Sequence, residues 1–228
     1  MLLSFGKTVS AAVIPSGYQD CEVVNAGDME KKETLAAEKR KELGIVENSS
    51  ARTTTWSYLP SSPRNYVCYT QLEDYFCIPA CVQSVLMYLN GSAPSQYIIA
   101  EDLDVEEIDG GGKFCKIRPY LNEKQYVNYY VQKDYTISFD TMKTDLYQAI
   151  TLFQAPAILG IVADESNWEY QTSGHVLTLA GARDDKAMFE FADPLMKRLN
   201  PSQSDRYQKI ASVVYTVLTA KSKCGYIY

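Results

Sequence analysis

The pattern of hydrophobic and polar positions changes near Thr55. Residues 28–44 combine strong helix formers, interleaved charges and a closing glycine, but their apolar face is thin. Residues 47–65 are rich in Ser, Thr and Pro and lack helical periodicity, which is typical of a linker or extended arm. We therefore predict an N-terminal extension, residues 1–54, and one domain, residues 55–228. The helix in the extension is either a solvated spacer, which we favour, or a pro-segment that covers a groove.

The first half of the domain has a helical pattern. Residues 77–89 are almost continuously apolar, Pro79 suits the first turn of a helix, and Asn90 with Gly91 provides a stop. This pattern places Cys77 at the N-terminus of a buried helix. Residues 95–103 and 139–153 predict two further helices, and the GGGK sequence at 110–113 predicts a loop.

The second half has the pattern of a sheet. Short apolar or alternating runs, separated by turn residues, occupy residues 155–163, 175–185, 187–194 and 211–220. Strands that follow one another closely in sequence are usually antiparallel. A helical half followed by a sheet half predicts the α+β class.

One cysteine has the surroundings that a nucleophile needs. A thiolate is stabilised at a helix N-terminus and beside an imidazolium, and the chain has a single histidine, His175, at the beginning of a predicted strand. Asp193 ends the next strand. A hairpin between the two strands would bring His175 and Asp193 to the same edge of the sheet, where the carboxylate could fix the tautomer of the ring. These positions suit a Cys, His, Asp triad.

Acyl transfer also needs donors for the developing oxyanion, commonly a side-chain amide and the backbone N–H of the nucleophile. Gln71 lies shortly before Cys77 and can supply that amide. Together with Ala80 and Cys81, with HVLTLAGARDD and with FEFADP, these residues resemble the papain-like peptidases of the bacteriocin-processing type, which cleave double-glycine leader peptides, and their stand-alone relatives. The resemblance spans roughly residues 66–194.

The resemblance implies a papain-like fold, with the nucleophile on the central helix. It implies the role of nucleophile for Cys77, base for His175, orienting acid for Asp193 and oxyanion donor for Gln71. The family usually has Gly directly after the nucleophile, whereas this chain has Ile78, which would narrow the cleft or impair the oxyanion hole. The processing enzymes are normally fused to a transporter, but no transmembrane segment or P-loop occurs here. A free-standing bacterial hydrolase therefore fits better.

Each candidate also has a purely structural interpretation. Cys77 and His175 could be core residues, Asp193 could serve the turn before Pro194, and Gln71 could lie on a loop surface. Cys81, one turn further along the helix, is the competing thiol, and we interpret it as structural or disulfide-forming. Asp184 and Asp185 end the preceding strand too far along to reach the histidine. Trp168 and Tyr170 form either a cleft wall or ordinary packing.

Composition and charge limit the classes of partner that this chain is expected to bind. The 228 residues carry a formal net charge of −6, which gives no electrostatic reason to bind nucleic acid or an anionic membrane surface. The six cysteines contain no CxxC pair, so we expect no metal and no cofactor. If Cys77 stays reduced, at least one more thiol is free unless it pairs between chains. The oligomeric state and the redox compartment stay open.

The beginning of the chain bears on localisation. Its apolar run has small residues at Ala11 and Ala12, as an export signal has near its cleavage site, but Gly6 and Lys7 interrupt the run and no basic segment precedes it. It is either a weak export signal or an N-terminal tail. We expect an extracellular or cell-surface protein, with a cytoplasmic location as the alternative.

Three functions fit these residues. The preferred one is a cysteine peptidase that hydrolyses peptide or protein substrates. The second is an acyltransferase or transpeptidase that uses the same triad with another acceptor, and the third is an inactive pseudo-peptidase that only binds peptide. The aromatic and basic segment 110–139 is the expected wall of the specificity pocket, or else a cover over the core.

Overall fold

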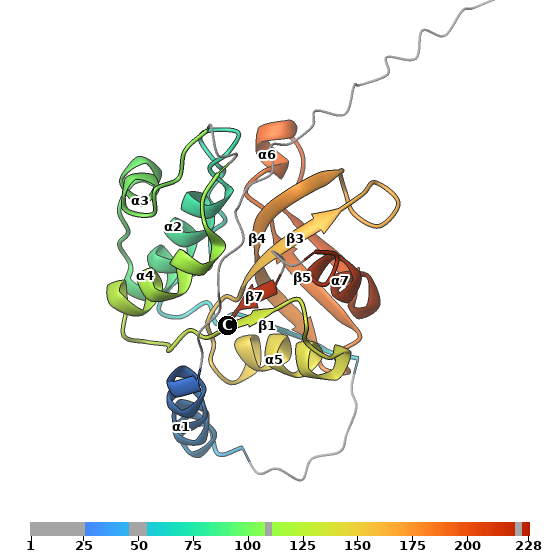
Figure 1. The fold of residues 1–228 in the computed structure, drawn as a ribbon. Coiled ribbons are helices and arrows are strands. Elements are labelled where there is room, and N and C mark those ends of the chain that lie inside the picture. Colours follow the sequence, from blue (N-terminus) through green and yellow to red (C-terminus); the bar gives the residue numbers. More distant parts are fainter. Residues whose placement is uncertain (1–25, 46–53, 108–110, 222–224) are drawn as a thin grey trace, which may run out of the picture.

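A computed structural model describes residues 26–45, 54–107, 111–221 and 225–228 (Figure 1). The export-signal candidate, Gly110, Cys21 and Cys224 lie outside the described residues. The described helices are α1 Ala26–Glu42, α2 Cys77–Asn90, α3 Gln96–Asp102, α4 Ile117–Lys124, α5 Phe139–Thr151, α6 Met196–Leu199 and α7 Ala211–Leu218, with a 3₁₀ turn at Phe114–Lys116. The strands are β1 Trp56–Tyr58, β2 Gln132–Asp134, β3 Ile158–Ala163, β4 Thr172–Arg183, β5 Met188–Ala192, β6 Arg206–Ile210 and β7 Gly225–Ile227.

The central helix α2 begins and ends where its sequence predicts. It starts at Cys77, and it ends at Gly91, which adopts the left-handed conformation (φ 78°) and donates its N–H to the carbonyl of Met87. Most of its side chains are buried, as expected for a nearly uniform apolar run. The neighbouring helix α3 is capped by Ser95, whose hydroxyl accepts from the N–H of Ile98. Helices α2, α3 and α4 form the left half of the molecule in Figure 1.

The sheet forms the other half. Its strands run in the order β2-β7-β3-β4-β5-β6, β1 pairs with the end of β4 at Arg183, and every pairing is antiparallel. Strand β4 is buried along most of its length and contacts α2, while α7 packs against β3 on the side away from α2 (Figure 1). The α+β class, with a helical half and an antiparallel sheet half, is confirmed.

One element prediction is wrong. Residues 211–220 were expected to form a strand, but 211–218 form the helix α7. Its buried residues are Ala211, Val214, Val217 and Leu218. They recur every three or four positions, which is the period of a helix face and not of a strand. The two valines raise β-propensity, but packing against the sheet decides the conformation.

Helix α1 docks on the domain and does not stand free in solvent as a spacer would. The side chain of Lys32 is 2% exposed, and its ammonium donates to Asn128 Oδ1 at 3.0 Å. The same ammonium lies 3.4 Å from the ring centre of Phe153 and 4.8 Å from that of Tyr228. Asp28 forms an ion pair with Arg118 and accepts from the hydroxyl of Tyr129. Polar and cation–π contacts therefore compensate for the thin apolar face of α1.

A cavity of about 720 Å³ lies beside α1. It is lined by α1 residues and by a segment that follows α4, which includes Gln125, Tyr126 and Tyr129. None of the predicted triad residues lines it. The 110–139 segment that was expected to wall a specificity pocket also contributes Tyr130 and Val131 to the core, where both are fully buried.

The two halves join beside the C-terminal end of β5. The backbone N–H of Gln71 donates to the carbonyl of Pro194 at 3.0 Å. On the exposed side, Arg198 of α6 donates to Asp74 at 2.7 Å and to the carbonyl of Leu72. The loop before α2 and the turn after β5 are therefore held together across the junction.

Candidate active site

Cys77 is the first residue of α2, and its side chain is 3% exposed. No side chain caps this helix, because Phe76 occupies the N-cap position. The first N–H groups of a helix have no acceptor within it, and Pro79 has no N–H at all. The N–H groups of Cys77 and Ile78 are therefore available to a negative charge beside the thiol, where the helix dipole also favours one.

His175 reaches this thiol from β4. Its Nε2 lies 2.8 Å from Asp193 Oδ1, so Nδ1 is the ring nitrogen left to face Cys77. The Cys77 side chain lies close enough to the ring to contribute to the raised pKa of His175. The three side chains come from α2, from β4 and from the turn after β5, and the structure brings them together at the N-terminus of α2.

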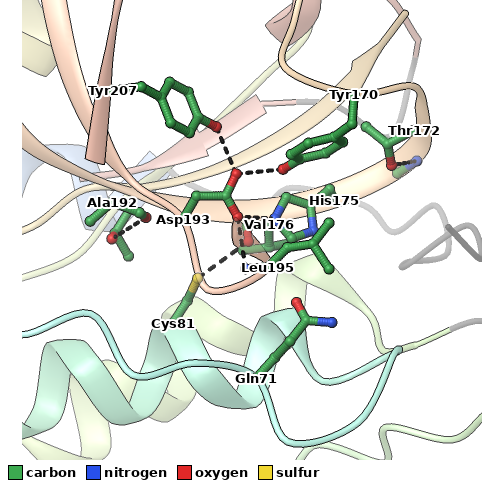
Figure 2. Close-up of polar contacts among 12 residues, drawn as sticks. Gln71, Cys81, Tyr170, Thr172, His175, Val176, Ala192, Asp193, Leu195 and Tyr207 are labelled. Atoms are coloured by element: carbon green, nitrogen blue, oxygen red, sulfur yellow. Dashed lines mark hydrogen bonds and ion pairs between the residues drawn. The ribbon is translucent and has the colours of Figure 1, made fainter. Parts of the chain in front are cut away.

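Asp193 is fully buried and follows β5 directly. The antiparallel register pairs Thr178 with Ala192, so the hairpin places Asp193 beside the residues just before Thr178 on β4. Its Oδ1 accepts from His175 and from the N–H of Leu195 at 3.0 Å. Its Oδ2 accepts from the hydroxyls of Tyr170 and Tyr207, at 2.5 Å and 2.6 Å (Figure 2).

The charges of the pair follow from these contacts. Burial opposes a charged ring, but the Asp193 carboxylate and its hydrogen bond outweigh burial, with a further contribution from Cys77, and raise the pKa of His175 to about 10. Burial likewise opposes ionisation of Asp193, but the imidazolium and the hydrogen bonds from His175, Tyr170 and Tyr207 lower its pKa. At neutral pH the site therefore holds an imidazolium and a carboxylate, and the imidazolium lies beside the Cys77 thiol.

Gln71 lies at the junction, 1% exposed. Its Nε2 donates to the carbonyls of Glu73 and Asp74, both at 3.0 Å, and its Oε1 has no hydrogen-bond partner among the described residues. A carbonyl oxygen only accepts, so the amide must present Nε2 to these two groups. Both amide hydrogens are thus used within the loop, and the amide becomes a donor to an oxyanion only by giving up one of these bonds.

Cys81 is a structural thiol in the described part of the chain. Its Sγ donates to the carbonyl of Val176 at 3.3 Å, and burial raises the pKa of this thiol well above its usual range (Figure 2). Cys68 is also free, and burial raises its pKa too. Within this single chain, Cys68 and Cys81 are therefore free in addition to Cys77, whereas the expectation allowed pairing between chains as the exception. Cys115, in contrast, is disulfide-bonded.

Two residues near the triad were not assigned to it from the sequence. Tyr170 was interpreted as a cleft wall or packing, and Tyr207 of β6 was not singled out, yet both bind Asp193. No motif marks them, because each contributes only a hydroxyl from a position set by the fold. The rejected candidates have other roles: Asp184 accepts from Ser57, and Asp185 binds Arg183.

The described residues contain no group of three or more His, Cys, Asp or Glu side chains that could hold a metal ion. Within the same ranges no helix is long and apolar enough to span a membrane.

Comparisons with known proteins identify the fold. The chain is similar to the crystal structure of xylellain, a cysteine protease from Xylella fastidiosa, with a TM-score of 0.54, 9% identity, and coverage of 100% of this chain and 98% of that one. The chain has the fold of a papain-like cysteine protease. No protein-family model and no curated protein matches its sequence. The likeness to xylellain therefore lies in the fold, which is the one that the sequence predicts.

Proposed function

We propose that this chain is a cysteine peptidase that hydrolyses peptide bonds through a thioester on Cys77. The observation that carries the proposal is the arrangement at the N-terminus of α2: the Cys77 thiol lies beside the His175 ring, and that ring is hydrogen-bonded to a buried carboxylate. A thiol nucleophile is activated by this order of groups, in which a ring lies beside the thiol and a carboxylate orients the ring. The similarity of the fold to that of a cysteine protease supports the same reaction class.

In the proposed reaction the Cys77 thiolate attacks the scissile carbonyl carbon, and the carbonyl oxygen becomes an oxyanion. The backbone N–H groups at the start of α2 stabilise this oxyanion. The imidazolium of His175 protonates the leaving amine as the C–N bond breaks, which leaves a thioester. Neutral His175 then takes a proton from water, the hydroxide attacks the thioester, and the acid product leaves with the thiolate and imidazolium restored.

The type of peptidase, its location and its substrate class are further parts of this proposal. The bacteriocin-processing type of peptidase is supported by Gln71, Cys77, Ala80 and Cys81 in one motif, and not by the comparisons. An extracellular or cell-surface location is supported by the disulfide at Cys115, because such bonds persist mainly in oxidising compartments. A peptide or protein substrate follows from the reaction class.

Cleavage of a complex peptide mixture, followed by mass spectrometry, tests the proposed function. The full chain is compared with Cys77→Ala and with Cys81→Ser, a matched control that keeps a donor for the carbonyl of Val176. The proposal predicts cleavage by the wild type and the control but not by Cys77→Ala. Products extended by an amine or thiol acceptor would favour acyl transfer instead. A wild type that neither cleaves nor transfers would contradict an enzymatic role.

A further inference from the structure

The fully buried Asp193 carboxylate is saturated with hydrogen-bond donors. An ionised carboxylate has about four acceptor positions on its two oxygens. Asp193 fills them with the ring of His175 and the N–H of Leu195 on Oδ1, and with two tyrosine hydroxyls on Oδ2. The contacts to Oδ1 involve a catalytic residue and a backbone group. The contacts to Oδ2 come only from the two tyrosines, among the residues that the structure describes.

Both tyrosines are held firmly. The ring of Tyr170 packs edge-on against that of His175, with centroids 5.6 Å apart and an interplanar angle of 85°. The ring of Tyr207 packs edge-on against Trp168 at 5.7 Å and 82°. Tyr170 therefore contacts both the ring and the carboxylate of the pair, whereas Tyr207 contacts only the carboxylate, which it approaches from the other side in Figure 2.

Both hydroxyls act as donors at neutral pH. Burial, followed by the nearby Asp193 carboxylate, raises the pKa of Tyr170 and Tyr207 well above the usual value. An ionised carboxylate has no proton to give, so a protonated phenol beside it is the hydrogen-bond donor. Hydrogen bonds to a charged acceptor are stronger than those between neutral groups. Without these donors, a fully buried carboxylate would favour its protonated form.

From this geometry we infer that Tyr170 and Tyr207 are positioning residues of the active site, which keep Asp193 ionised and turn its Oδ1 toward His175. The inference rests on the proposed function and adds two residues to its machinery. Neither tyrosine touches the reacting atoms. They act through Asp193, which in turn orients the imidazolium that protonates the leaving group.

The variants Tyr170→Phe and Tyr207→Phe remove one donor each and keep the ring. The matched control is Tyr215→Phe, which removes a hydroxyl that donates to the carbonyl of Ile137, away from the triad. Loss of a donor raises the pKa of Asp193, so the acidic limb of the pH profile of kcat/KM should move upward by about one unit in each variant. At the optimum, kcat should fall about tenfold while KM changes little, because a misaligned general acid weakens the transition state and not binding.

A second readout does not need catalysis. His175 is the only histidine in the chain, so its ring ¹⁵N signals in the full-length protein are assigned without ambiguity. As the pH falls, the Nε2 signal changes when Asp193 is protonated and the hydrogen bond between them is altered. This inflection should move upward by about one unit in Tyr170→Phe and Tyr207→Phe, and further in the double variant.

The outcomes separate the two claims. An inflection that stays where it is in the wild type and in Tyr215→Phe, with only a lower thermal midpoint, would overturn the positioning role and leave the tyrosines as packing residues. A shifted inflection in a protein that cleaves no peptide would support the positioning role and contradict the proposed function. If one variant fails to fold, the other single variant decides the question.

Discussion

At the scale of single residues, the side-chain amide of Gln71 has two competing sets of hydrogen-bond acceptors. Its amide hydrogens hold the carbonyls of Glu73 and Asp74, and these bonds shape the loop that leads into Cys77. An oxyanion would compete for one of the same hydrogens. The loop is also tied to the turn after Asp193 through the Gln71 N–H and the carbonyl of Pro194. The residue therefore affects both the shape of the site and its chemistry.

Replacing Gln71 by Glu tests the structural role of the amide. The new carboxylate would direct oxygens at two carbonyl oxygens in a buried position, and the unsatisfied groups should lower the free energy of unfolding by about 2 kcal/mol or more. Gln71→Met, which removes the donors without adding charge, is the comparison and should cost less. Urea denaturation of both variants measures the difference. Equal stability of Gln71→Glu and wild type would show that the two carbonyl contacts do not hold the loop.

The three residues of the proposed triad could be picked out at this scale, but the tyrosines that contact Asp193 could not. Cys77, His175 and Asp193 are marked by residue type and by their places at the ends of elements, and only one histidine had to be considered. Tyr170 and Tyr207 lie 23 and 14 residues before and after Asp193. Among eighteen tyrosines, nothing in their sequence surroundings distinguishes them. Their role depends on where β6 and the end of the β3–β4 connection meet in space.

At the scale of elements, Ile78 shows how α2 differs from the expected pattern. The sequence suggested that a side chain here, where the family has Gly, would narrow the cleft. In the structure Ile78 is 1% exposed and belongs to the core, and its Cδ1 faces the Val105 and Gly112 region. Its backbone N–H remains at the open end of the helix. The isoleucine therefore stabilises the helix start without occupying the position of a backbone donor.

Ile78→Gly should consequently destabilise the protein. Removal of a buried isoleucine side chain costs about 2–5 kcal/mol, and Gly in a helix adds about 1 kcal/mol. Ile78→Val is the matched control, with an expected loss of about 1 kcal/mol. Chemical denaturation monitored by circular dichroism checks both values. A Gly variant as stable as the wild type, with higher activity, would instead support the idea that the side chain obstructs the cleft.

Elements with a strong local signal were predictable, and elements defined by partners were not. Helix α2 has a continuous apolar run with a glycine stop, and α5 has a Ser138 cap. The three-residue strands β2 and β7 carry almost no pattern and exist because they pair with each other, while β7 also pairs with β3. Helix α7 was mistaken for a strand because β-branched residues outweighed a short helical period.

At the scale of the whole molecule, the buried His175–Asp193 pair makes stability depend on pH. The pKa of His175 in the folded protein is about 10, above the unfolded value of about 6.5, so its contribution is complete below 6.5 and is lost as pH rises toward 10. The pKa of Asp193 is lowered on folding, so its contribution is present above the unfolded value and is lost as pH falls through the folded one. The pair therefore contributes most in mildly acidic solution.

A double-mutant cycle with His175→Gln and Asp193→Asn isolates this contribution. The coupling free energy should be largest near pH 5 to 6, should decline between about pH 6.5 and 10, and should also decline at strongly acidic pH. Unfolding in urea at a series of pH values measures it. A coupling that is constant up to pH 10 would mean that the ring is not charged in the folded protein.

The central claim is that Cys77 is the activated thiol of this molecule, and its alkylation tests that claim most directly. The full chain is treated with iodoacetamide at neutral pH, and mass spectrometry follows the modification of Cys77 and Cys81 in the wild type and in His175→Ala. The account predicts that Cys77 reacts well ahead of Cys81 and that this advantage disappears without His175. Equal rates for the two cysteines, or an unchanged Cys77 rate in His175→Ala, would contradict it.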